Sequence, residues 1–163
     1  MGTGTPLPLS FAEMARIRSE IRAGFPGLAA TFQVTSEETG RYNCIAWAAG
    51  DTSRWWWPLY PSYWPGDAPR EATLEAFDAA FATLGFAPCG DGNTEDGVEK
   101  VVLYLRQGVP THMARQMPSG AWSSKLGEAW DIGHLLPAEV SGRVYGDAVQ
   151  YLARPRIELS AEN

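Results

Sequence analysis

Residues 41–50 read Arg-Tyr-Asn-Cys-Ile-Ala-Trp-Ala-Ala-Gly and place one of the chain's two cysteines at the start of a short apolar run. Polar residues before Cys44 and alanines after it predict a helix that begins at or beside the cysteine and ends at Gly50. A helix start presents unpaired N–H groups and the positive end of the helix dipole, which favour a thiolate. Cys44 is therefore a candidate nucleophile, although a cysteine next to Ile45 and Trp47 is more commonly packed in a core.

A candidate base lies on a predicted strand further along the chain. Residues 109–117 read as a strand on which His112 shares one face with Ala114 and Gln116. That face is small and polar, which suits a cleft better than a core. An imidazole there can accept the thiol proton and later deliver it to a leaving group. We therefore expect Cys44 and His112 to meet in the folded chain as nucleophile and base.

The strand after the histidine supplies groups that can orient the imidazole. Residues 118–120 predict a hairpin turn, and residues 121–126 predict a strand that folds back beside His112. The residue opposite His112 depends on the turn type and is one of three: Ser124, Lys125 or Leu126. The candidates for the orienting role are Ser124, Asp131 and His134.

Helical patterns come before strand patterns in this chain. A capping box at Ser10-Phe11-Ala12-Glu13 predicts a helix that ends at Gly24, and Pro69 to Leu84 predicts another. The expected strands are 86–89, 98–105, 109–117, 121–126 and one or two within 144–152, whereas 127–137 gives no clear assignment. This order predicts an α+β fold in which N-terminal helices, including the one that carries Cys44, pack on an antiparallel β-meander.

The composition is that of one globular domain over residues 1–163, with loose tails at 1–9 and 156–163. A net charge of -6 opposes non-specific binding to nucleic acid or to an anionic membrane. No apolar run is long enough to span a bilayer, and the first residues show no secretory signal. We therefore expect a cytoplasmic protein, or one exported without an N-terminal signal.

The cysteines and histidines do not form a recognisable metal motif. Cys44 and Cys89 make no disulfide framework, and free thiols in a reducing compartment are expected. Cys89 follows Pro88 and precedes a Gly-Asp turn, so we treat it as incidental. The four Cys and His residues lack the paired close spacing of a zinc site, and the acidic turns at 91–97 lack the ligand order of an EF-hand. No metal and no cofactor is expected.

Tryptophan is unusually abundant, with seven residues, and it is concentrated in one proline-rich stretch. The clustered residues are Trp55, Trp56, Trp57 and Trp64. Three prolines within this stretch exclude a continuous helix and disfavour a central strand, so residues 51–68 are predicted to be a long ordered loop. The loop can form a substrate-binding wall of a cleft, or its tryptophans can simply cover the core.

Asn43-Cys44 at a helix start, followed by a meander whose second strand carries Thr111-His112 and small residues, resembles the papain-like cysteine hydrolase superfamily. The likeness covers about residues 36–135 and is closest to small bacterial amidase and toxin domains. It implies a papain-like fold, a Cys44 nucleophile, a His112 base and a polar third residue one strand later. It also implies cleavage, deamidation or acyl transfer at an amide or peptide bond of a peptide or protein substrate.

Two departures from the family pattern concern the supporting residues. Many relatives place Asp, Asn or His on the strand after the histidine, where this chain has Ser124. The usual oxyanion glutamine upstream of the cysteine is absent, so Asn43 or a backbone amide would have to serve.

Two other functions fit the same sequence. A non-catalytic module on this fold would use the tryptophan loop to bind a peptide, glycan or protein. A toxin or effector domain would act on a host protein or be held by an immunity protein.

Overall fold

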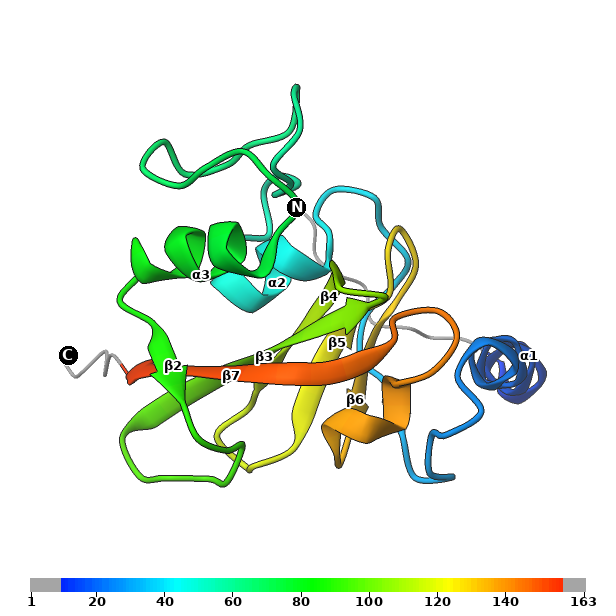
Figure 1. Cartoon of the computed structure of the whole chain (residues 1–163). Coiled ribbons are helices and arrows are strands. Elements are labelled where there is room, and N and C mark those ends of the chain that lie inside the picture. The colour runs from blue at the N-terminus through cyan, green and yellow to red at the C-terminus, as the bar shows by residue number, and fades with distance from the viewer. Residues whose placement is uncertain (1–9, 157–163) are drawn as a thin grey trace, which may run out of the picture.

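A seven-stranded antiparallel sheet organises residues 10–156, the part of the chain that this computed structural model describes (Figure 1). The strands are β1 (Gln33–Val34), β2 (Ala87–Cys89), β3 (Val98–Arg106), β4 (Val109–Gln116), β5 (Trp122–Lys125), β6 (Asp131–His134) and β7 (Asp147–Pro155). Their order across the sheet is β1-β6-β5-β4-β3-β7-β2. The predicted meander is therefore present as β3 to β6, and β7 returns to pair with β3 on its other side.

Two helices begin where the sequence predicts them. In α1 (Phe11–Gly24) the Ser10 hydroxyl accepts from the Glu13 N–H, and the Glu13 carboxylate accepts from the Ser10 N–H, both at 3.0 Å. In α2 (Cys44–Ala49) the cysteine is the first helical residue, and Gly50 ends the helix with a φ of 87°. The capping box and the helix-borne position of Cys44 are confirmed, because both depend on contacts between near neighbours in the chain.

The third helix is shorter than its apolar spacing predicts. It is α3 (Leu74–Ala82), and the Thr73 side chain caps it by accepting from the Ala76 N–H at 3.1 Å. The Trp64 indole donates to the Pro69 carbonyl at 2.8 Å, so the expected first turn belongs to the preceding loop. Residues 69–73 therefore precede the helix, which begins after the Thr73 cap.

Side-chain alternation gives the sheet two faces with separate hydrophobic cores. On the α2 face, Leu103 of β3 and Met113 of β4 pack with residues of α2 and α3, which lie together on one side of the sheet in Figure 1. On the α1 face, Tyr104 and Ala114 belong to the core that includes Ile17 of α1. Neighbouring residues of one strand therefore point into different cores.

The predicted long loop connects α2 to α3 and projects above these helices in Figure 1. It is held closed by backbone bonds from Trp57 N–H to the Tyr63 carbonyl at 3.0 Å and from Tyr63 N–H to the Trp55 carbonyl at 3.2 Å. Trp56 and Trp64 are buried in the α2-face core, at 4% and 3% exposure. The loop is ordered as expected, and part of it does cover the core.

The remaining segments complete the sheet. The unassigned region contains β6 followed by a short 3-10 helix (Pro137–Val140). Arg156 is anchored by its N–H to the Gly97 carbonyl at 2.8 Å, and the rest of the two expected tails lies outside the described residues. None of the described helices has the length and apolar character needed to cross a bilayer.

Candidate active site

Cys44 borders a pocket of about 330 Å³ at the start of α2. The other residues that line this pocket, the Cys44 pocket, are Asn43, Trp55, Trp57, Ser62, Thr111, Gly127 and Tyr145. The cysteine is 7% exposed and forms no disulfide. The pocket thus joins the helix start, the tryptophan loop and the beginning of β4, which are distant in the sequence.

Three hydrogen bonds hold the Asn43 side chain between α2 and the loop. Its Oδ1 accepts from the N–H groups of Ala46 and Trp56, both at 3.1 Å, and its Nδ2 donates to the Trp56 carbonyl at 2.9 Å. Asn43 is therefore the helix N-cap and the link that keeps the loop beside Cys44. The second Nδ2 hydrogen has no partner among these bonds, and the oxyanion role of Asn43 stays a prediction.

The Cys44 sulfur lies against the backbone on both sides of His112. Its thiol donates to the Thr111 carbonyl at 4.0 Å, and the Met113 backbone also bonds to the sulfur. Burial raises the pKa of Cys44 to about 11, and backbone groups of Met113, Cys44 and Ile45 oppose this effect. Within the described residues no hydrogen bond joins the thiol to the imidazole: the sulfur contacts the backbone on either side of His112, while the His112 ring lies with Tyr104 on the α1 face.

His112 belongs to a chain of side-chain hydrogen bonds on the α1 face. Its Nε2 lies 3.0 Å from Ser124 Oγ, which lies 2.8 Å from His134 Nε2. His134 Nδ1 lies 2.9 Å from the Leu136 carbonyl and must be the donor there, because a carbonyl only accepts. A neutral His134 then accepts from Ser124, and Ser124 accepts from Nε2–H of His112.

This proton arrangement leaves the lone pair of His112 on Nδ1. That nitrogen is buried and has no hydrogen-bond partner in the described structure. The ring stacks on Tyr145, with centroids 3.9 Å apart and planes inclined by 6°, and Tyr145 also lines the Cys44 pocket. The Nδ1 nitrogen of His112 therefore has no hydrogen-bond partner in the described residues and belongs to the same segment of β4 whose backbone contacts the Cys44 sulfur.

The expectation that His112 faces a cleft is wrong. The residue is fully buried at 0% exposure, and its ring contacts both Tyr104 and Tyr145. Ala114 and Gln116 on its own strand are small or polar, but the tyrosines that enclose it come from other parts of the chain. Burial and the nearby His134 together lower the pKa of His112 well below its usual value, so the imidazole is neutral at pH 7.

The three candidates for orienting the imidazole fall on different faces. Ser124 contacts His112 directly, and His134 acts through Ser124. Asp131 pairs with Lys125 across β5 and β6, whereas Ser124 pairs with Ile132, so Asp131 faces the other way. Its carboxylate accepts from the Tyr42 hydroxyl at 2.9 Å on the α2 face, and Asp131 therefore does not orient His112 in this structure.

The four tryptophans expected to bind substrate separate into two pairs. Trp55 and Trp57 are half-buried and line the Cys44 pocket. Trp56 and Trp64 are core residues that pack near Phe81 and Phe77 respectively, so a substrate-binding role for them is not supported. All four lie on one loop, and the conformation of that loop turns Trp55 and Trp57 toward the pocket and Trp56 and Trp64 into the core.

Tyr145 lines the pocket and was not among the site residues predicted from the sequence. Thr111 Oγ1 donates to the Tyr145 carbonyl at 2.6 Å, which holds the segment against β4. Gly146 follows with a φ of 78°, and a Cβ there would lie 2.0 Å from the Leu105 carbonyl oxygen. The Tyr-Gly pair was the available signal, because such close backbone approach requires glycine.

The charged groups near the site do not form a metal centre. Within residues 10–156, no three His, Cys, Asp or Glu side chains come together as they would around a metal ion. The buried cationic group near the site is the Lys125 ammonium. It donates to the carbonyls of Thr39, Gly127 and Ala129 at 2.7 to 2.9 Å.

The fold and site define an α+β domain with a buried cysteine beside a buried histidine chain. The sequence profile described as a domain of unknown function, DUF7689, matches residues 33–153, and the chain belongs to this family. No curated protein and no solved structure matches the chain. The matched region begins at β1, ends within β7 and includes the thiol, the imidazole chain and the tryptophan loop.

Proposed function

We propose that this protein is a papain-like thiol hydrolase that cleaves an amide or peptide bond, with Cys44 as nucleophile and His112 as base. The observation that carries the proposal is the placement of the sulfur against Thr111 and Met113, the residues on either side of His112. The His112 ring is held through Nε2, and its Nδ1 lone pair is left without a partner. In this proposal Cys44 is the nucleophile, His112 is the base and Ser124 is the group that orients the base.

The reaction starts from a neutral pair, because burial raises the pKa of Cys44 and lowers that of His112. When a substrate carbonyl fills the pocket, the thiol turns away from the Thr111 carbonyl and the sulfur attacks the carbonyl carbon. The thiol proton passes to Nδ1 in the same step. Hydrogen bonds to a catalytic base are often long in a ligand-free enzyme and tighten when substrate binds, which fits this resting arrangement.

The remaining steps return each group to its starting state. The imidazolium Nδ1–H protonates the leaving amine as the C–N bond breaks, which leaves a thioester on Cys44. His112 then takes a proton from water, the resulting hydroxide attacks the thioester, and the acid product leaves. The sulfur departs as a thiolate and recovers its proton from Nδ1. Ser124 and His134 keep the ring in the tautomer that these steps need.

Alkylation of Cys44 tests the pairing without a known substrate. In a Cys89→Ser background Cys44 is the sole cysteine, since the chain has only two. We expect iodoacetamide to modify Cys44 at pH 7.5 roughly tenfold or more faster than in the same protein carrying His112→Asn, because the base is lost. Mass spectrometry over time gives both rates. Met113→Leu, a change of similar volume on the same strand, is the control for repacking.

Turnover provides the second half of the test. Wild-type protein and Cys44→Ala are incubated with a mixture of peptides, and new termini or deamidated products are identified by mass spectrometry. The proposal requires products that disappear in Cys44→Ala while the variant unfolds at the same temperature as wild type. Equal alkylation rates with and without His112, together with products that survive Cys44→Ala, would overturn it.

A non-catalytic binding module is the second candidate, and the state of the thiol favours it. At pH 7 the buried Cys44 is protonated and bonded to the Thr111 carbonyl, while the aromatic pocket above it is preformed. In that case Trp57→Ala weakens peptide binding and Cys44→Ala leaves it unchanged. A toxin or effector role, with a host or immunity protein as partner, stays a prediction of the family resemblance.

A further inference from the structure

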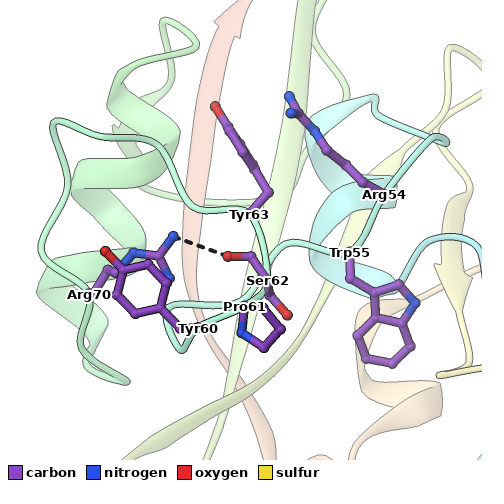
Figure 2. A pocket seen from close by; sticks show the side chains of 7 residues that line it. All are labelled: Arg54, Trp55, Tyr60, Pro61, Ser62, Tyr63 and Arg70. Atoms are coloured by element: carbon purple, nitrogen blue, oxygen red, sulfur yellow. Dashed lines mark hydrogen bonds between the residues drawn. The ribbon is translucent and has the colours of Figure 1, made fainter.

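A second pocket of about 560 Å³ adjoins the Cys44 pocket (Figure 2). Arginine and aromatic side chains form most of its wall, and we call it the arginine pocket: Arg54, Trp55, Tyr60, Ser62, Tyr63 and Arg70. Trp55 and Ser62 also line the Cys44 pocket, so the two spaces share a wall. A molecule long enough to reach past Ser62 can occupy both.

The charge of the arginine pocket is opposite to that of the chain as a whole. The sequence has 19 acidic and 13 basic residues, yet the pocket lining contains two arginines and no Asp or Glu. Arg54 is compensated, because its Nε donates to Asp51 at 2.8 Å while the guanidinium lies over the Tyr63 ring. The positive character of the pocket therefore comes mainly from Arg70.

Arg70 is held in place but not neutralised. One terminal nitrogen donates to the Ser62 carbonyl at 3.1 Å, and the guanidinium carbon lies 3.9 Å from the centre of the Tyr60 ring. Figure 2 shows the Arg70 side chain beside the Tyr60 ring and its hydrogen bond to Ser62. Arg70 takes part in none of the ion pairs found within residues 10–156. Its Nη1 is buried and has no hydrogen-bond partner in that region. A positioned guanidinium that no carboxylate neutralises within the described residues is suited to an anionic acceptor.

We propose that the arginine pocket binds a carboxylate of the substrate and that Arg70 recognises it. The planar guanidinium matches a carboxylate, and the Tyr60 and Trp55 rings offer apolar surface for the carbon atoms next to it. This inference rests on the proposed function, because the shared wall places the carboxylate beside the bond that Cys44 attacks. The substrate class is then a peptide or amide that carries a carboxylate, from a chain terminus or an acidic side chain, near the reacting carbonyl.

Calorimetric titration of the Cys44→Ala protein separates binding from turnover. The probes are N-acetylphenylalanine, its neutral amide and N-acetylglutamic acid α-amide, which present a terminal carboxylate, none, and a side-chain carboxylate. We expect at least one carboxylate probe to bind roughly tenfold or more tighter than the neutral amide, because a charged acceptor pairs with Arg70. Tighter binding of one acid than of the other identifies the source of the carboxylate.

Two arginine variants make the comparison specific. Arg70→Met is expected to abolish the preference for the acid, and Arg70→Lys to keep part of it, because lysine retains the charge without the planar fork. Arg16→Met is the matched control and should change affinity by less than about twofold, since Arg16 is an exposed arginine of α1 that pairs with Glu20 and lines neither pocket. Thermal unfolding of each variant checks that the loop remains folded, and Arg70→Lys decides the matter if Arg70→Met does not fold.

Equal affinity for acid and amide, or equal effects of Arg70→Met and Arg16→Met, would overturn the carboxylate site. Failure of the hydrolase proposal gives a different result. In that case Arg70-dependent acid binding persists in both wild type and Cys44→Ala, while no peptide is cleaved by either protein.

Discussion

The two faces of the sheet bury polar groups in different ways. On the α2 face, the Lys125 ammonium is surrounded by three backbone carbonyls, and the nearby Asp131 accepts from Tyr42. On the α1 face, His112, Ser124 and His134 form a chain of neutral groups. Strand register separates the two sets, because Lys125 and Ser124 are neighbours on β5 and point in opposite directions.

The difference shows which groups can change protonation during a reaction. A buried charge held by fixed carbonyls stabilises one arrangement and is costly to alter. A neutral imidazole with one free ring nitrogen can gain and lose a proton while its other nitrogen stays bonded to Ser124. We therefore interpret the α2-face charges as scaffold and the α1-face chain as the part suited to chemistry.

Replacing the buried lysine should have the largest effect on stability. Lys125→Met leaves three carbonyls without a donor and Asp131 without its nearby cation, so we expect a loss of about 3–5 kcal/mol in the free energy of unfolding. Urea unfolding at pH 7 measures it.

Lys100 is the matched control, since it is equally buried but pairs with Asp91 and Glu95, whose side chains are 57% exposed. Those carboxylates regain water when the lysine is removed. Lys100→Met should therefore lower the free energy of unfolding by less than Lys125→Met does. Equal losses in the two variants would contradict the view that fixed carbonyls make Lys125 special.

Removing the hydroxyl at the centre of the histidine chain should have an intermediate effect. Ser124→Ala leaves His112 Nε2–H and His134 Nε2 buried without partners, and we expect a loss of about 2 kcal/mol in the free energy of unfolding. Ser124→Ala should also slow alkylation of Cys44 and alter its pH profile, because the imidazole is no longer held in one tautomer.

Ser123→Ala provides the comparison on the α2 face. Ser123 Oγ accepts one bond, from the Trp47 indole at 3.0 Å, so its loss should cost about 1 kcal/mol and leave the alkylation profile unchanged. An identical pH profile in both serine variants would show that the Ser124 hydroxyl has only a structural role.

The smallest expected effect is a difference between wild type and His112→Asn in how much stability each loses at acidic pH. Because burial lowers the pKa of His112 in the folded protein, the unfolded chain takes up a proton first as pH falls through about 6.5. Stability is therefore complete above that pH and declines below it. When the pH is lowered from 7 to 5.5, we expect the free energy of unfolding of His112→Asn to fall by about 1 kcal/mol less than that of wild type.

Urea unfolding at the two pH values measures this difference. His134 also has a lowered pKa and is present in both proteins. A variant as acid-sensitive as wild type would mean that His112 is already charged when folded, contrary to its burial.

Local features were readable from the sequence because they depend on residues close together in the chain. Ser10 and Glu13 form the capping box, α2 begins at Cys44 and ends at Gly50, and the strand carrying His112 has the predicted extent to within one residue. The α+β order of helices and antiparallel strands follows from the same patterns. The papain-like arrangement of these elements remains part of the proposal.

Several site features were not readable because they depend on contacts between distant segments. The small residues beside His112 suggested a cleft, but Tyr104 and Tyr145 close over the ring from other elements. Ser124 and Asp131 were equal candidates until the pairing of β5 with β6 placed them on opposite faces. The role proposed for Arg70 has no sequence signal, since an isolated arginine in a loop has no distinctive pattern.

The sequence by itself determined that a short helix begins at or beside Cys44 and that His112 lies inside a strand followed by the strand of Ser124. Hydrogen bonds and side-chain periodicity within contiguous segments were sufficient for that. Only the tertiary structure decided which nitrogen of His112 is free, how deeply the thiol is buried and which pockets surround it. These properties depend on strand register and long-range packing, which bring together residues that no local pattern relates.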